Sequence, residues 1–170
     1  VVRVPEALTE RVRADLRRPH PFAFERVGFL HARVSRVDNS NWLVLPYAFY
    51  AVPDGQYIRD DLVGARIDGA SIRTQMERAL ESGVTVVHVH LHEHRGRPRF
   101  SSTDREGHGP LLRALHNAES NVPHGAMVLS QDSAIAVFRT PGDDSLRLAS
   151  KIAIVGRPLR LSGSGDELYA

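Results

Sequence analysis

The chain has 170 residues, 42% hydrophobic and 25% charged, with a formal net charge of +2, which is ordinary for one globular domain with a substantial core. It contains no Cys, so disulfides and thiol nucleophiles are excluded. No apolar run approaches the ~20 residues that cross a bilayer, and residues 1–10 lack the apolar core of a secretory signal. We therefore expect a cytoplasmic protein without a membrane partner.

The first third of the chain predicts a helix and a β-hairpin. Residues 5–18 favour a helix because apolar side chains recur every four positions and Pro suits the first helical position. Residues 24–37 and 42–52 are typical of strands, and the Asp-Asn-Ser-Asn sequence between them is typical of a turn. Residues 53–69 predict a loop with a short strand near its end.

A second helix leads into the most unusual stretch of the chain. Ser71 is a candidate N-cap for a helix that ends at Glu81, and Gly83 follows as its C-terminal signal. Residues 84–94 then alternate apolar side chains with histidines and predict a strand. Because side chains alternate between the faces of a strand, we expect four imidazoles on one face and Val87, Val89, Leu91 and Glu93 on the other.

The four imidazoles, His88, His90, His92 and His94, predict a metal site. Residues 95–98 are typical of a turn, which could bring Asp104 back over the end of the strand. Two imidazoles, one carboxylate and a water position are the composition of a catalytic zinc site, whereas structural zinc usually has four protein ligands. An accidental row of histidines remains the alternative.

The rest of the chain predicts a helix over residues 110–118, opened by its Pro, and a hairpin of residues 126–130 and 134–139. An apolar segment follows within residues 146–161. We assign residues 1–161 to a single α/β domain and the Ser- and Gly-rich residues 162–170 to a flexible tail.

Basic residues are scattered among acidic ones, and aromatic residues do not alternate with them, so a nucleic-acid partner is not expected.

The histidine strand and the residues after it resemble a known signature. His90-Leu91-His92 followed by Ser101-Ser102-Thr103-Asp104 is similar to the His-x-His…Ser-x-x-Asp motif of the JAMM (MPN+) zinc metalloproteases. Pairing His90 with His92 leaves eight residues before Ser101, one more than is usual in the family. Pairing His92 with His94 leaves six, and pairing His88 with His90 leaves ten. We favour His90 and His92, and the pair His92 and His94 stays open.

The family also carries a glutamate upstream, before a small-apolar-Leu run. Residues 24–30, Phe-Glu-Arg-Val-Gly-Phe-Leu, resemble that pattern, so Glu25 is the counterpart of this residue. The resemblance covers residues 24–137. It implies an MPN/JAB-like domain, a mixed curved sheet flanked by helices in a cytidine-deaminase-like arrangement.

The resemblance implies hydrolysis of the amide or isopeptide bond after the C-terminal glycine of ubiquitin or a ubiquitin-like protein. His90, His92 and Asp104 would bind one Zn²⁺, and Glu25 would act as general acid and base toward the zinc-bound water. Ser101 would stabilise the oxyanion or hold the water, although a helix-capping role is equally compatible with its position. Glu93 is a local competitor for the role of base. Activating or conjugating enzymes of the same pathway are expected partners.

Two other classes of function remain open. The domain could be a non-catalytic scaffold or binding module, as the MPN− relatives are. The metal site could also serve hydrolysis of a nucleotide or a small amide, although no Gly-rich phosphate-binding loop precedes a helix.

Overall fold

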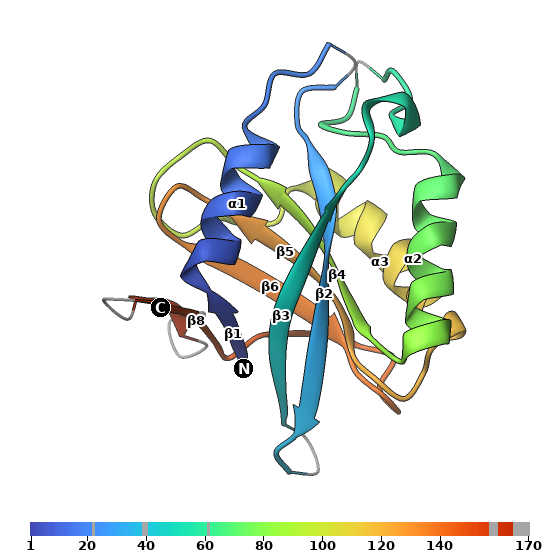
Figure 1. Ribbon diagram of the computed structural model, residues 1–170, viewed down its shortest axis with the longest axis vertical. Helices are drawn as coiled ribbons and strands as arrows, with labels where there is room; N and C mark the ends of the chain where they lie inside the picture. Colours follow the sequence, from blue (N-terminus) through green and yellow to red (C-terminus); the bar gives the residue numbers. More distant parts are fainter. Residues whose placement is uncertain (22, 39–40, 61, 157–159, 165–170) are drawn as a thin grey trace.

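The computed structural model describes residues 1–21, 23–38, 41–60, 62–156 and 160–164 (Figure 1). Its elements in chain order are β1 (Val2–Pro5), α1 (Glu6–Leu16), β2 (Val27–Arg36), β3 (Trp42–Ala51), a 3-10 turn (Asp54–Gln56), α2 (Gly69–Ser82), β4 (Thr85–Leu91), α3 (Ser102–Ala118), β5 (His124–Leu129), β6 (Ala134–Arg139), β7 (Leu146–Leu148), β8 (Lys151–Val155) and β9 (Arg160–Ser164).

The strands of the described residues form one nine-stranded mixed sheet in the order β7-β6-β5-β4-β2-β3-β1-β8-β9. The histidine strand β4 lies near its middle, antiparallel to β2 and parallel to β5. The sheet twists strongly between β3 and β6 (Figure 1). The α/β class and the curved mixed sheet expected from the sequence are thus confirmed.

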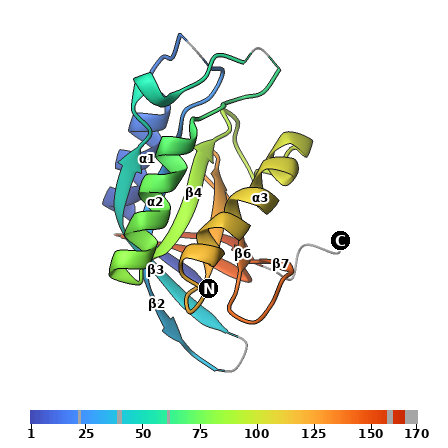
Figure 2. The same cartoon turned by 90° about the vertical axis from the view of Figure 1, so that its right-hand side faces the viewer.

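Helices cover both faces of the central strands (Figures 1 and 2). Helix α1 buries Leu8, Val12 and Leu16 against the face of β4 that carries Val87, Val89 and Leu91. Helices α2 and α3 cover the opposite face, where Ala79, Leu112 and Leu115 pack with Phe29, Val86 and Ala126. Residues of β4 therefore alternate between two apolar layers, and His88 and His90 belong to the face under α2 and α3.

Both predicted hairpins are present, with small differences at element ends. Strands β2 and β3 pair antiparallel, as do β5 and β6. Strand β2 begins at Val27, so Glu25 precedes the strand that was expected to carry it. Helix α2 begins at Gly69, and its N-cap is Asp68, whose side chain accepts a hydrogen bond from the Ser71 backbone N–H. The prediction that Ser71 is the N-cap was therefore wrong.

Helix α3 differs most from the expectation. It begins at Ser102, two turns before the expected start, and contains Pro110 in its interior. Ser101 and Asp104 form a capping box at its N-terminus, which satisfies backbone N–H groups that would otherwise lack partners. The described chain also begins with the short strand β1, where Pro5 is the N-cap of α1 and not its first helical residue.

The expected flexible tail is partly ordered, because residues 162–164 complete β9, which pairs with β8; residues 165–170 lie outside the described residues. Among the described helices, none is long and apolar enough to span a bilayer.

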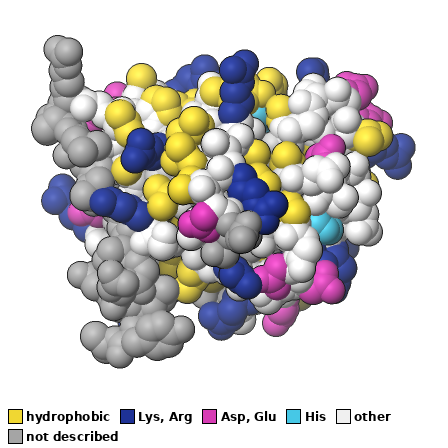
Figure 3. Space-filling view, turned by 90° about the horizontal axis from the view of Figure 1, so that it is seen from below, with side chains coloured by type: hydrophobic (Ala, Val, Ile, Leu, Met, Phe, Trp, Pro, Cys, Tyr) yellow, Lys and Arg dark blue, Asp and Glu magenta, His cyan; other side chains and the backbone are white. Residues whose placement is uncertain are grey.

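Seen from below, the surface mixes basic, acidic and hydrophobic side chains (Figure 3). This mixing is in keeping with the small net charge.

Candidate metal centre

The histidine row extends beyond its strand. Strand β4 ends at Leu91, so the expectation that all four histidines lie in one extended strand was wrong. His92 nevertheless continues the pairing, because its N–H donates to the Leu129 carbonyl at 2.9 Å. The chain then turns at Gly96, which has φ 82° and is tied to the β5–β6 connection: its N–H donates to Asp132 at 2.7 Å and its carbonyl accepts from Ser130 at 2.7 Å. This turn returns the chain toward the histidines.

Asp104 reaches the histidines from the first turn of α3. Its Oδ2 accepts the Ser101 backbone N–H at 2.7 Å, while Ser101 Oγ accepts the Asp104 N–H at 3.0 Å. Its Oδ1 lies 3.1 Å from His90 Nε2, and its Oδ2 lies 3.8 Å from His92 Nε2. The capping box therefore fixes the carboxylate against the two imidazoles. The same geometry gives Ser101 the capping role.

The two imidazoles lie close to each other as well. His90 Nε2 and His92 Nε2 are 3.2 Å apart. His90 is almost fully buried, whereas His92 lies at the edge of the site. Asp104 meets the two imidazoles with different carboxylate oxygens. Glu25, His90 and His92 each offer one atom within 4.8 Å of the others, so these three could hold a metal ion together. Of the open pairings, His90 and His92 are the pair that Asp104 meets. His94 is exposed and its Nδ1 contacts the Arg95 carbonyl.

Glu25 faces the same point from the loop before β2. One of its carboxylate oxygens lies within 4.8 Å of a ring nitrogen of both His90 and His92. The backbone N–H groups of Phe24 and Glu25 both donate to the Gly64 carbonyl at 2.9 Å, which fixes the loop. Glu93 lies away from the imidazoles, with its Oε1 3.6 Å from Arg17 Nε beyond the end of α1. Its expected place on the opposite face is confirmed.

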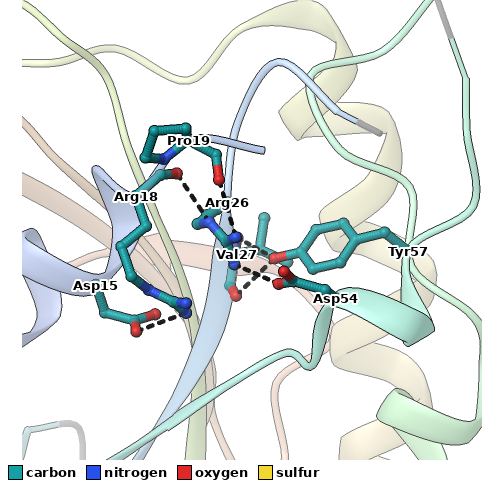
Figure 4. A network of polar contacts seen from close by, with 7 residues as sticks. All are labelled: Asp15, Arg18, Pro19, Arg26, Val27, Asp54 and Tyr57. Atoms are coloured by element: carbon teal, nitrogen blue, oxygen red, sulfur yellow. Dashed lines mark hydrogen bonds and ion pairs between the residues drawn. The ribbon is translucent and has the colours of Figure 1, made fainter. Parts of the chain in front are cut away.

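A buried arginine next to Glu25 anchors this loop (Figure 4). Arg26 is 4% exposed and donates to the carbonyls of Arg18 and Pro19 at 2.8 and 3.0 Å. Its Nη1 forms an ion pair with Asp54 Oδ1 at 2.7 Å. Three segments separated in sequence therefore meet at Arg26, which limits the movement of the neighbouring Glu25.

The loop is also held by Tyr57, whose hydroxyl accepts the Val27 N–H at 2.9 Å and donates to the Val27 carbonyl at 3.2 Å (Figure 4). We expect Tyr57→Phe to lower the free energy of unfolding by about 1–3 kcal/mol, because the buried Val27 N–H loses its acceptor. Urea denaturation measures this change. Tyr47→Phe is the control, since Tyr47 is exposed and its hydroxyl should contribute little; equal losses in both variants would contradict the role of Tyr57.

A pocket of about 500 Å³ adjoins these residues. It lies between the loop that carries Asp60 and residues 63–67 and the first turns of α3, and Glu25, His90 and Asp104 line it. Apolar side chains including Val63 and Leu111 line it further out. The converging side chains are therefore accessible to a molecule bound in the pocket.

Electrostatics favour the neutral form of His92 and the ionised form of Asp104. Burial lowers the pKa of His92, and the charge of His90 lowers it further. Burial acts in the opposite direction on Asp104, but the hydrogen bond and charge of His90 and the bonds from Ser101 outweigh it, so the pKa of Asp104 lies below its usual value. Neutral imidazoles and an ionised carboxylate are the protonation states that bind metals.

Two further histidines adjoin the site: His88, one of the four imidazoles of the predicted row, and His108. His88 is on β4, and His108 is on α3, where it is 4% exposed. Their ring centroids are 5.8 Å apart, and His108 is 6.2 Å from His90. His108 was not among the candidate ligands, although residues four apart, such as Asp104 and His108, share a helix face. That spacing, with the alternation in β4, was the signal available in the sequence.

Comparison with known proteins does not identify a family for the chain. No family model matches the chain, and no curated protein matches it.

Proposed function

We propose that the chain is a zinc metallo-isopeptidase of the JAMM (MPN+) kind, with an MPN/JAB-like domain. The observation that carries the proposal is the contact of the Asp104 carboxylate with both His90 and His92, with Glu25 within 4.8 Å of the same two imidazoles from another segment. These are the residues that the sequence motif selects, although they come from three separate segments of the chain.

The donor atoms suit zinc in kind and in spacing. Ligands at Zn–N distances of about 2.0–2.1 Å in a tetrahedron lie about 3.3 Å from one another. The separations of 3.2 Å between the imidazole nitrogens and 3.1 Å between His90 Nε2 and Asp104 Oδ1 are near this value. The 3.8 Å from His92 Nε2 is to the other oxygen, Oδ2, so coordination through one oxygen requires the Asp104 side chain to move. Three protein ligands leave one position open, as in catalytic sites.

Bound zinc would polarise a carbonyl oxygen and lower the pKa of water toward neutrality. Glu25 would accept the proton of the attacking water and return it to the leaving amine, because it faces the ligands without belonging to the capping box. Ser101 Oγ accepts the Asp104 N–H, so its own hydroxyl proton is left to donate into the pocket toward a developing oxyanion.

The proposed substrate is the C-terminal tail of ubiquitin or a ubiquitin-like protein, cleaved after its terminal glycine. An extended tail could enter the pocket beside residues 63–67, which lies next to Glu25 and the imidazoles. Activating or conjugating enzymes of the same pathway are the proposed partners.

The test is cleavage of a ubiquitin-like protein that is extended beyond its terminal glycine. We expect the purified chain to cleave the fusion, to lose activity with a zinc chelator and to regain it with added zinc. Zinc binding without cleavage of any such fusion would favour hydrolysis of a smaller substrate. Absence of zinc binding would favour the scaffold alternative.

Gly64 offers a specific test of the position of Glu25. A Cβ at Gly64 would lie 2.8 Å from Glu25 Oε2 and 2.9 Å from its Cδ, so Gly64→Ala must displace the carboxylate. We expect turnover to fall about 10–100-fold while zinc content is unchanged, since a misplaced acid–base group forfeits part of a contribution of roughly 10²–10⁴-fold. Steady-state cleavage and metal analysis measure the two effects. Gly55→Ala is the control, because a Cβ there meets nothing within 4 Å; unaltered turnover in Gly64→Ala would contradict the role of Glu25.

A further inference from the structure

Beside the proposed catalytic site, the same face of β4 carries a second group of histidines. His88, His90 and His108 each offer a ring nitrogen within 4.8 Å of the others, and together they could hold a metal ion. His90 and His108 are 2% and 4% exposed, and all three histidines line the pocket. A metal would reach them through the same opening as the substrate.

Buried histidines elsewhere in the fold have partners that account for them. His31 Nε2 is 2.7 Å from the side-chain oxygen of Gln75. His124 uses both ring nitrogens, with Nδ1 accepting the Val86 N–H at 3.1 Å and Nε2 lying 2.9 Å from the Glu119 carbonyl. Among the described residues, the Nδ1 atoms of His88 and His90 are buried with no hydrogen-bond partner.

An unpaired buried nitrogen is unfavourable, since it loses its bonds to water without replacement. Two such nitrogens beside a third imidazole gain a common partner if one metal ion binds them. His90 can take part in both groups, because its Nε2 faces His92 and Asp104 while its Nδ1 has no partner among the described residues.

We propose that His88, His108 and Nδ1 of His90 form a second metal site, which takes a divalent transition metal that prefers imidazole nitrogen. An all-nitrogen ligand set suits Zn²⁺, Cu²⁺ or Ni²⁺ and disfavours Mg²⁺ and Ca²⁺. His90 then joins the two sites as a shared ligand. When the second ion binds, the remaining ring proton of His90 leaves to solvent, so that both nitrogens can donate to metal.

The test is zinc stoichiometry of the intact chain, measured by calorimetric titration of the metal-free protein and by metal analysis after desalting. We expect two Zn²⁺ per chain in the wild type and one in His108→Gln or His88→Gln. His90→Ala should retain neither. Proton release on filling the second site should appear as a dependence of the binding enthalpy on the buffer.

His116→Ala is the matched control. His116 is on the same helix, and its Nδ1 also lacks a partner among the described residues, but it is outside the cluster. It should keep both ions. A wild type that binds a single ion, which both His88→Gln and His108→Gln retain, overturns the second site.

The outcomes also separate this site from the proposed function. A single ion that is lost in Asp104→Asn and kept in His108→Gln would overturn the second site and leave the catalytic one. An ion that is kept in Asp104→Asn and lost in His108→Gln would support the second site and count against the proposed function.

Discussion

Replacing Asp104 by Asn is expected to release the catalytic zinc and to abolish cleavage. The carboxylate lies 3.1 Å from His90 Nε2 and 3.8 Å from His92 Nε2. Among the described residues of α3, it is the only anionic group that meets both imidazoles, and the substitution removes its charge. Loss of a residue that merely orients a ligand weakens metal binding about 10–100-fold, and loss of the ligand itself should exceed that. Competition with a chromogenic chelator measures the affinity.

Because Asp104 also caps α3, a variant that keeps the cap is needed. The amide oxygen of Asn can still accept the Ser101 N–H, so Asp104→Asn should retain the helix. Ser101→Ala is the complementary control: it removes the other half of the capping box, with a loss of about 1 kcal/mol in stability, and should keep zinc. Equal zinc affinity in Asp104→Asn and wild type would refute the ligand role.

The double role of Asp104 explains which part of the site the sequence predicted poorly. Ser-x-x-Asp is both a metalloprotease signature and a capping pattern that begins a helix. A capping role for Ser101 was left open, but the helix was still expected to begin at Pro110. Pro110 lies inside α3, where it removes one backbone N–H donor, while His108, Leu112 and Leu115 bury one face of the helix.

Local periodicity predicted the strands and helices that carry a regular apolar pattern, including β3, β4 and the β5–β6 hairpin. It missed β1, since four residues are too short for a pattern and the pairing partners, β3 and β8, are distant in the sequence. It also missed His108, because that residue becomes part of the site only when α3 packs on β4. The register of the histidine pair likewise depended on how the turn at Gly96 is anchored, which involves a distant hairpin.

Glu25→Gln is expected to keep zinc and to lose turnover about 10²–10⁴-fold, the usual contribution of a positioned acid–base group. The amide retains the size of the side chain but cannot take a proton from water. Since Glu25 lies within 4.8 Å of the nitrogens of His90 and His92, it is close enough to serve either as a base or as a further ligand. Parallel zinc analysis and steady-state cleavage distinguish these roles.

Glu93→Gln is the matched control for this experiment. Glu93 is adjacent to His92 in sequence, but its carboxylate lies by Arg17 on the opposite side of the strand, so its loss should leave both zinc and turnover unaltered. If Glu25→Gln instead released the metal, Glu25 would be a ligand, and the proton would need another acceptor. If Glu93→Gln lowered turnover as strongly as Glu25→Gln, the chain beyond Leu91 would have to turn Glu93 toward the imidazoles when substrate binds. The pair of variants thus tests the geometry as well as the chemistry.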